Sequence, residues 1–306
     1  MRRILLWAAR NRWLKERLPR LPGVRRATRR FMPGETADDA IAAAVTHQGW
    51  HVNGVFTLLG ENVTDLAEAS AVADTYHGLI DRTAERGLDV EISLKLTQLG
   101  LDLDEATAFG LFDGLARHAA EQHSWAWIDM EGSAYTEQTI AFYERTRASH
   151  ANVGICLQAY LHRTPADVQR LLPIRPAIRL VKGAYDEAKS IAYRSRPEVD
   201  GAFLALSAQL LEAVKEDRGR YIAATHDVPL IERMARVGSA IGLGNGQIEI
   251  QMLYGVRTDQ QRRLARAGYD VRALIAYGTA WYPWYMRRLA ERPANVWFAL
   301  RQLLPW

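Results

Sequence analysis

The chain has 306 residues and a formal net charge of +4, with 48% hydrophobic and 24% charged residues. This composition is typical of a soluble globular protein and excludes extensive disorder. The single cysteine, Cys156, excludes an intramolecular disulfide and a cysteine-ligated zinc or iron–sulfur site within one chain, so a reducing cytoplasm is expected. No apolar run reaches the ~18 residues that a membrane-spanning helix needs.

Residues 1–35 are expected to form a basic, amphipathic N-terminal arm. Residues 1–30 contain eleven arginines and lysines but one acid, Glu16, and leucines and tryptophans lie between them. This pattern suits either an anionic membrane surface or a helix that packs on the domain with its arginines in water. A signal peptide is not expected, because Arg10 interrupts the short apolar stretch. Nucleic acid is not an expected partner, because no binding motif follows the basic stretch.

After the arm, short apolar segments alternate with longer amphipathic ones. The short segments are rich in β-branched and aromatic residues and are too short to be helices, which predicts strands. The eight predicted strands are Val52–Leu59, Val90–Leu96, Trp125–Met130, Val153–Gln158, Ala177–Val181, Tyr221–Thr225, Ile248–Leu253 and Val271–Tyr277.

The longer segments predict helices. An alanine-rich helix is expected to begin at residues 36–39, ahead of the first strand. The other predicted helices are Thr64–Glu85, Asp104–His118, Val168–Leu172 with an opening Pro165, Ala202–Lys215, Pro229–Arg236 and Asp259–Ala267. The pattern assigns no helix between the third and fourth strands.

Eight strands that alternate with helices imply parallel pairing through right-handed crossovers. The number of units favours a closed (β/α)8 barrel, with residues 36–306 as one catalytic domain. The alternative is an open doubly wound sheet, which a glycine-rich nucleotide-binding loop after the first strand would favour, and that loop is missing. The glycine cluster at residues 242–246 comes between the sixth and seventh strands and predicts a turn.

Polar residues gather where the predicted strands end, which is the face of a barrel where catalytic residues lie. The chain has only five lysines among 39 basic residues, yet Lys95 and Lys182 lie inside or just after strands, which suggests a need for a compact charge. A structural salt bridge at the barrel mouth is the alternative for either lysine. The strand-end set comprises Glu61, Lys95, Asp129, Glu131, Gln158, Arg179, Lys182, Gly183, Ala184, Thr225, His226, Gln251 and Tyr277.

Two adjacent arginines, Arg287 and Arg288, follow an aromatic run at residues 281–285. A planar guanidinium can hold a carboxylate through two hydrogen bonds, so this pair and Lys95 could form an anion clamp. The neighbouring aromatic residues favour a ligand that combines an apolar ring with a carboxylate. The alternative is that both arginines lie on a solvated helix face.

Several motifs together resemble the proline dehydrogenase family. In chain order they are ISLK at 92–95, ID at 128–129, LQAY at 157–160, RLVKGAY at 179–185, ATH at 224–226 and YPWYMRRLAE at 282–291. The resemblance covers roughly residues 40–300, and the length suggests a monofunctional member. It implies a distorted (β/α)8 barrel with a C-terminal helix over its mouth. The implied reaction is FAD-dependent oxidation of L-proline to Δ1-pyrroline-5-carboxylate by hydride transfer to flavin N5, with a membrane quinone as electron acceptor.

The resemblance also implies roles for individual residues. Asp129 would pair with Lys95 as part of the catalytic set, and Glu61 would form a gating ion pair with Arg287. The residues expected at the proline are Lys95, Leu253, Tyr277, Trp284, Arg287 and Arg288. The residues expected at the flavin are Gln158, Arg179, Val181, Lys182, Gly183, Ala184, Thr225, His226 and Glu291. No metal is expected.

One position departs from the family pattern, which usually has a tyrosine three residues before the first of the two arginines. This chain has Trp284 there, and its larger ring is expected to change the pocket that receives proline. Three other functions stay open. They are a Schiff-base aldolase that uses Lys182, a folate-linked flavin reductase on the same barrel, and a non-catalytic membrane-binding module built on the basic arm.

Overall fold

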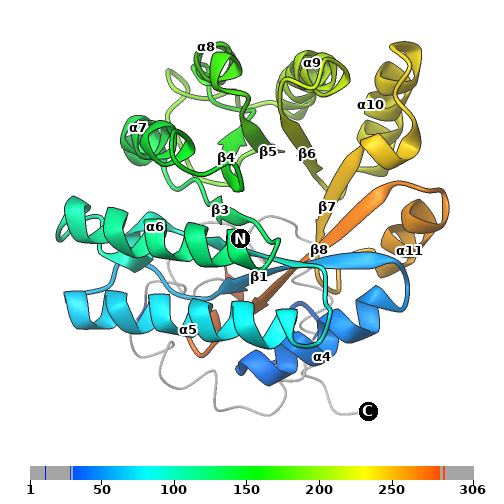
Figure 1. Ribbon diagram of the computed structural model, residues 1–306. Coiled ribbons are helices and arrows are strands. Elements are labelled where there is room, and N and C mark those ends of the chain that lie inside the picture. Colours follow the sequence, from blue (N-terminus) through cyan, green and yellow to red (C-terminus); the bar gives the residue numbers. More distant parts are fainter. Residues whose placement is uncertain (1–10, 12–27, 29, 283–284, 287–306) are drawn as a thin grey trace.

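The computed structural model describes residues 11, 28, 30–282 and 285–286, and shows a closed barrel of parallel strands with helices around it (Figure 1). Each strand pairs with the next along the chain, and β1 closes the barrel against β8. The strands are β1 Val52–Leu58, β2 Val90–Leu94, β3 Ala126–Ile128, β4 Val153–Gln158, β5 Ala177–Val181, β6 Arg220–Ala224, β7 Glu249–Leu253 and β8 Asp270–Tyr277.

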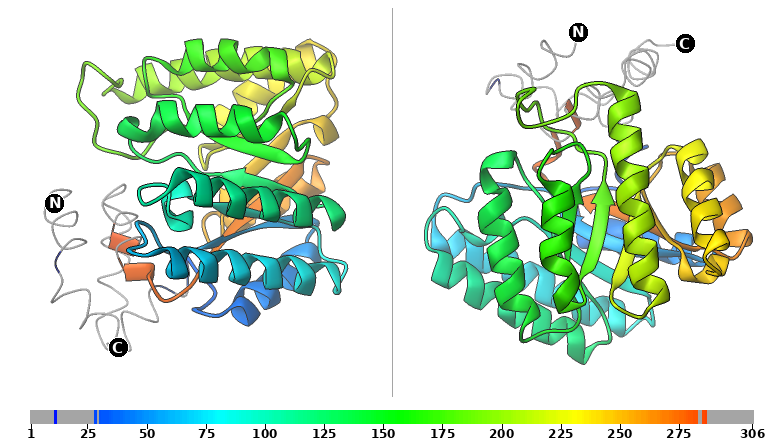
Figure 2. Two further views of the ribbon diagram at one scale, coloured as in Figure 1. Left: turned by 60° about the vertical axis from the view of Figure 1, so that its left-hand side comes forward. Right: turned by 90° about the horizontal axis from the view of Figure 1, so that it is seen from above.

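The helices lie on the outside of the barrel, and neighbouring ones run side by side along it (Figure 2). Several begin at side chains that accept a hydrogen bond from the first turn, such as Asp65, Asp104 and Ser195. The helices are α4 Ala37–Gln48, α5 Leu66–Ala84, α6 Glu105–Glu121, α7 Thr136–Arg147, α8 Thr164–Leu171, α9 Arg196–Lys215, α10 Val228–Ala240 and α11 Thr258–Arg266.

The prediction of a closed (β/α)8 barrel is confirmed, and every predicted strand matches an observed one to within two residues at each end. The glycine cluster is a turn that leads into a short 3-10 helix at Asn245–Gln247. The C-terminal helix that was expected over the barrel mouth falls mostly on residues 287–306, which lie outside the described residues.

Two helices differ from the prediction. Helix α7 was not predicted, because three of its buried side chains are threonines (Thr136, Thr139 and Thr146) and hide the apolar periodicity. Helix α9 begins at Arg196, well before the predicted Ala202, because Ser195 and Glu198 form a capping box around Pro197.

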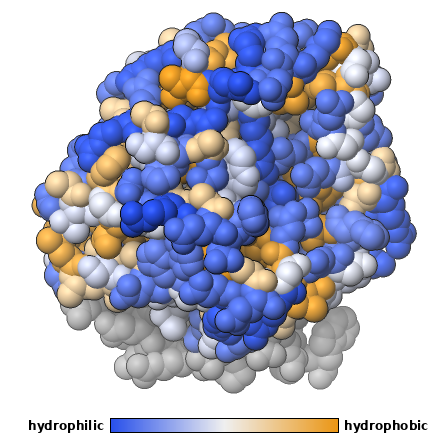
Figure 3. Space-filling view, in the orientation of Figure 1, coloured by the Kyte–Doolittle hydropathy of each residue, from blue (hydrophilic) through white to orange (hydrophobic). Residues whose placement is uncertain are grey.

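The main apolar core lies between the strands and the surrounding helices and includes Tyr76, Phe112 and Phe203, which are fully buried. The face shown in Figure 3 is mostly hydrophilic, with hydrophobic residues dispersed among hydrophilic ones. Along the described part of the chain, no helix combines the length and apolar character needed to cross a bilayer.

The inside of the barrel is unusually polar. Arg179 on β5 contacts Ser93 on β2, and Arg220 on β6 contacts Glu91 on β2. These strands are not neighbours, so both contacts cross the barrel interior. Most (β/α)8 barrels fill this space with branched apolar side chains. Here charged groups occupy it from the barrel floor to the mouth.

Candidate active site

Lys95 lies directly after β2, where the carboxyl ends of the strands meet. Its Nζ is 3.3 Å from Glu61 Oε2 and donates to the carbonyl oxygen of Gly60 at 3.3 Å. Glu61 follows β1, so this ion pair links two neighbouring strand ends. The Lys95 side chain is 17% exposed, which leaves its ammonium group within reach of a ligand at the mouth.

Asp129 and Arg179 form a second ion pair, which reaches across the barrel from β3 to β5. Arg179 is almost fully buried, and its guanidinium also donates to Ser93 Oγ at 3.0 Å and to Gln251 Oε1 at 3.4 Å. Burial is the largest influence and acts to lower the pKa of Arg179, but the charge of Asp129, the contact with Cys156 and the charge of Glu91 together outweigh it, so the pKa is raised. The arginine therefore stays a fixed positive charge below the barrel mouth.

The structure therefore pairs these residues differently from the expectation. Lys95 pairs with Glu61, and Asp129 pairs with Arg179, so the expected Lys95–Asp129 pair is wrong. The physical reason is side-chain length: the long Arg179 side chain spans the barrel interior and pairs with the Asp129 carboxylate. The expected Glu61–Arg287 pair involves a residue outside the described part of the chain.

Lys182, at the end of β5, belongs to a third cluster of charges. Its Nζ contacts Asp200 on α9 and is 2.9 Å from Asp227 after β6. Arg196 reaches the same carboxylates, at 2.7 Å from Asp227 and 3.4 Å from Asp200. Two acids and two bases thus join the β5 and β6 loops. Lys182 thus lies between two carboxylates that occupy its ammonium group.

The other predicted flavin contacts lie along the same face. Gly183 has a φ of +112°, and a Cβ there would lie 2.1 Å from the Tyr160 ring, so the position requires glycine. Thr225 Oγ1 accepts from Asp227 N at 3.2 Å, and His226 Nε2 accepts from Leu253 N at 3.4 Å. Val181 ends β5, and Ala184 is exposed in the loop that follows.

Three buried polar atoms near the strand ends have no hydrogen-bond partner among the described residues. They are Gln158 Oε1 at the end of β4, Gln251 Nε2 on β7 and Tyr277 Oη at the end of β8. Burial raises the pKa of Tyr277, which keeps its hydroxyl protonated as a donor. Leaving such groups unpaired costs about 1–3 kcal/mol each, so they favour a ligand that hydrogen-bonds here.

Glu131 was predicted at a strand end, but its partner Thr97 was not. Glu131 Oε1 accepts from Thr97 Oγ1 at 2.8 Å, and burial raises the pKa of Glu131. Ser93 was missed as well, although it precedes Lys95 by two residues and so faces the same side of the strand. That two-residue spacing was the signal that could have found it.

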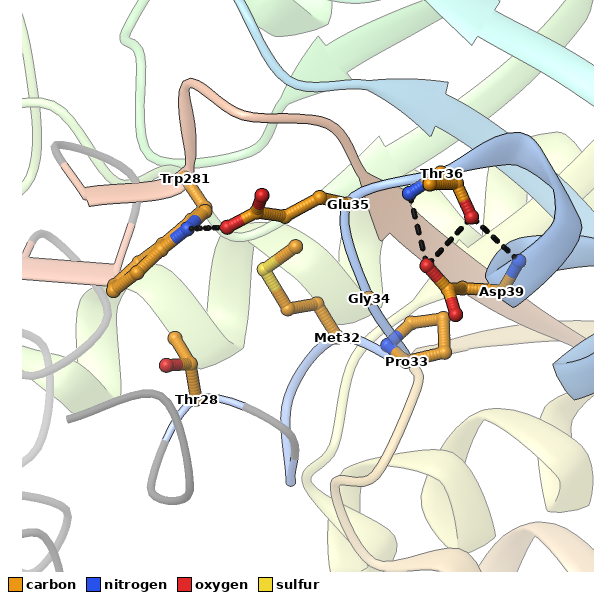
Figure 4. Close-up of a pocket in the computed structure, with 8 residues that line it drawn as sticks. All are labelled: Thr28, Met32, Pro33, Gly34, Glu35, Thr36, Asp39 and Trp281. Carbon is orange, nitrogen blue, oxygen red and sulfur yellow. Dashed lines mark hydrogen bonds between the residues drawn. The ribbon is translucent and has the colours of Figure 1, made fainter. Parts of the chain in front are cut away.

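Thr28 and residues 30–36 pack against the chain that follows β8, and the two segments border a cavity of about 280 Å³ (Figure 4). Trp281 Nε1 donates to Glu35 Oε1 at 2.9 Å, and the Phe31 and Tyr285 rings are 6.0 Å apart. A Cβ on Gly255, after β7, would lie 1.5 Å from the Arg30 carbonyl oxygen, so the two backbones touch. Among the predicted site residues that the structure describes, none lines this cavity.

The Glu35–Trp281 hydrogen bond is expected to stabilise this contact. Glu35→Ala should lower the free energy of unfolding by about 1–2 kcal/mol, because a hydrogen bond to a charged, half-buried acceptor is lost. Glu35→Gln keeps an acceptor oxygen and should retain most of the stability. Urea denaturation checks both variants. An unchanged midpoint for Glu35→Ala would show that the hydrogen bond adds nothing to packing.

Four predicted site residues lie outside the described residues: Trp284, Arg287, Arg288 and Glu291. Tyr277 and Leu253 lie at the ends of neighbouring strands, β8 and β7, and Tyr277 is buried with its ring 6.4 Å from that of Phe56. Among the residues that the structure describes, no group of three or more His, Cys, Asp or Glu side chains could hold a metal ion.

A parallel barrel with ion pairs and unpartnered polar atoms at the carboxyl ends of its strands defines an enzyme of the (β/α)8 class. Residues 40–301 match the sequence profile described as proline dehydrogenase. The chain belongs to the proline dehydrogenase family, whose members oxidise proline.

Curated relatives agree with this assignment, and a solved structure agrees with the fold. Proline dehydrogenase 1 of Bacillus subtilis subsp. natto is 35% identical over 306 residues, which is 99% of each chain. The proline dehydrogenase of Deinococcus radiodurans is 34% identical over 281 residues, or 90% of this chain and 89% of that one. In fold, the chain is similar to proline utilization A from Bdellovibrio bacteriovorus, with a TM-score of 0.81 and 20% identity over 94% of this chain and 38% of that chain.

Proposed function

We propose that the chain is a monofunctional, FAD-dependent enzyme that oxidises L-proline to Δ1-pyrroline-5-carboxylate and passes the electrons to a membrane quinone. The observation that carries the proposal is the barrel mouth, where Lys95 and the buried Arg179 lie among unpartnered polar atoms. These groups suit an anionic substrate beside a polar aromatic cofactor.

The described residues fit a flavin. An isoalloxazine ring has both donors and acceptors along its polar edge, and the unpartnered groups offer both kinds: Gln251 Nε2 and Tyr277 Oη can donate, and Gln158 Oε1 can accept. Arg179 supplies a positive charge that would stabilise an anionic reduced ring. Gly183 keeps the loop after β5 free of a side chain. Lys182, Thr225, His226 and Glu291 would complete the cofactor contacts, and bound FAD would supply the hydride acceptor.

The substrate would bind through its carboxylate. Lys95 is proposed to hold that carboxylate together with Arg287 and Arg288, while Leu253, Tyr277 and Trp284 surround the apolar ring. These contacts fix the ring carbon from which hydride leaves, and such positioning alone can lower a barrier by several kcal/mol. No general base is required if proline binds with its amine already neutral.

The basic arm would bring the enzyme to its electron acceptor. A cytoplasmic protein that reduces a membrane quinone must approach the bilayer, and the interleaved arginines and tryptophans of residues 1–30 suit the anionic inner face of the cell membrane. Sedimentation with anionic vesicles, compared between the full chain and a chain that lacks residues 2–25, tests this role. Equal binding by both chains would assign the arm to packing.

The visible spectrum of the purified protein tests the central proposal. The protein should absorb near 450 nm as a bound flavin does, and L-proline under argon should bleach this band. N-propargylglycine, with which the Bdellovibrio protein was inactivated, should abolish the bleaching by proline. A colourless protein that is inert to proline would refute the proposal. Bleaching by NADH without proline would favour the folate-linked reductase, and borohydride trapping of a substrate on Lys182 would favour the aldolase.

A further inference from the structure

Ser93 is a fully buried hydroxyl inside the barrel, one residue before the end of β2. Its Oγ donates to Asp129 Oδ1 at 2.8 Å and accepts from Arg179 Nη2 at 3.0 Å. Arg179 Nη2 also donates to the same Asp129 oxygen. Side chains from β2, β3 and β5 thus form a closed triangle. A hydroxyl suits this place because it donates and accepts at once.

The atoms around the triangle fix Ser93 in place. Tyr76 Oη donates to the Ser93 carbonyl oxygen at 2.8 Å and accepts from Leu58 N at 2.9 Å, so a buried tyrosine on α5 ties β2 to β1. The Ser93 hydroxyl therefore has little freedom to move away from Arg179.

The Arg179 guanidinium is held on its other sides too. Its Nη1 donates to Gln251 Oε1 at 3.4 Å, and its central carbon is 5.4 Å from the centroid of the Trp127 ring. Nη2 thus uses one N–H for Ser93 Oγ and the other for Asp129 Oδ1, and these two bonds together fix the angle between the guanidinium and the carboxylate. Without the hydroxyl, a two-bond pairing between arginine and aspartate becomes the favoured geometry, and the guanidinium would turn toward Asp129.

We infer that Ser93 is a positioning residue for the reaction, which holds the Asp129–Arg179 pair so that the guanidinium keeps one orientation below the barrel mouth. The inference rests on the proposed flavin function, because the Arg179 charge is the group that acts on the reduced ring. A charge that is fixed before the reaction stabilises developing negative charge better than one that must reorient. Lys95 contacts Glu61 instead, so the substrate carboxylate should not depend on Ser93.

The test compares Ser93→Ala, which removes the hydroxyl, with Ser93→Thr, which retains one. Ser207→Ala is the matched control. Ser207 is equally buried, and its hydroxyl donates to Phe203 O and bonds Tyr221 Oη, on the outer side of the barrel. The readouts are the flavin midpoint potential, measured by dye equilibration without proline, and kcat and KM with a soluble acceptor.

Ser93→Ala is expected to lower kcat about tenfold with an unchanged KM for proline. A tenfold loss of stabilisation of the two-electron reduced flavin lowers the midpoint potential by about 30 mV. Ser93→Thr and Ser207→Ala should retain the wild-type potential. If Ser93→Ala does not fold, Ser93→Cys keeps the size but bonds weakly and replaces it. Wild-type potential and kcat in the variant without the hydroxyl would overturn the inference, whereas a colourless wild-type protein would instead refute the proposed function.

Discussion

Replacement of Lys95 by methionine is expected to raise the KM for L-proline by about 10- to 100-fold while the protein keeps its flavin. A charge-assisted hydrogen bond to a partly buried carboxylate contributes about 1.5–3 kcal/mol, and each 1.4 kcal/mol changes affinity about tenfold. Methionine keeps the unbranched apolar stem, so the loss reports the ammonium group rather than packing. Steady-state kinetics with a soluble acceptor, together with the flavin absorbance of the purified variant, measure both quantities.

Two further variants make the test specific. Lys189→Met removes a lysine from an exposed loop position and should leave KM unchanged. Glu61→Gln removes the carboxylate that lies 3.3 Å from Lys95 Nζ. Because that carboxylate competes with the substrate for the lysine, Glu61→Gln should not raise KM through Lys95. A wild-type KM in Lys95→Met would leave Lys95 as a purely structural ion pair at the mouth.

The fold was predictable because a barrel of parallel strands is encoded locally. Each strand is a short β-branched or aromatic segment, and most are followed by an amphipathic segment. The prediction failed for α7, whose inward face carries threonines, and it placed the start of α9 too late because the capping box at Ser195 was not recognised. Closure by the β1–β8 pairing then followed from the number of units.

The sequence predicted which described polar residues lie near the carboxyl ends of the strands, but not how they pair. Strand ends identify which residues reach the mouth, and Lys95, Asp129 and Arg179 were all found in this way. Which acid pairs with which base depends on side-chain length and on the distance between strands across the barrel. The linear sequence pattern does not give that distance. Arg179 is long enough to reach Asp129 two strands away, so Lys95 takes Glu61 next to it. Ser93 was overlooked because a single serine in an apolar strand has no chemical signature of its own.

The same two-residue period that connects Lys95 to Ser93 leads one step further down β2, to Glu91. Glu91 is 2% exposed, and its carboxylate accepts from Trp127 Nε1 at 2.7 Å. It also lies 2.7 Å from Arg220 Nη2 and 3.5 Å from Arg272 Nη1. Both Glu91 and Glu249 contact these two arginines at the barrel floor, but Glu91 lies closer to Arg272, at 3.5 Å against 4.0 Å for Glu249.

Each of the other acids at the barrel floor forms its shortest contacts with one arginine. Glu249 accepts three hydrogen bonds from Arg220, at 2.8, 3.0 and 2.6 Å, and Asp89 lies 2.8 Å from Arg272. Burial acts to lower the pKa of Arg220, but the charges of Glu91 and Glu249 outweigh it, so the pKa is raised and the arginine stays charged. Removal of one acid therefore leaves a buried positive charge only partly compensated.

Glu91→Gln is accordingly expected to lower the free energy of unfolding by about 3 kcal/mol, near the low end of the 3–5 kcal/mol that follows loss of one partner from a buried ion pair. The low end applies because both arginines keep a second acid. The amide can still accept from Trp127, so the change isolates the charge rather than the hydrogen bond to the indole. Urea denaturation, with the slope compared between variants, measures the difference.

The matched control is Glu85→Gln, which removes an exposed acid 3.9 Å from Arg86 and should change stability by less than about 0.5 kcal/mol. Because the floor network is remote from the mouth, Glu91→Gln that remains folded should keep the wild-type KM for proline. A loss of less than about 1 kcal/mol would mean that the remaining acids neutralise both arginines by themselves. A raised KM in the folded variant would instead show that loss of the Glu91 charge at the barrel floor alters the Arg179–Asp129 ion pair near the mouth.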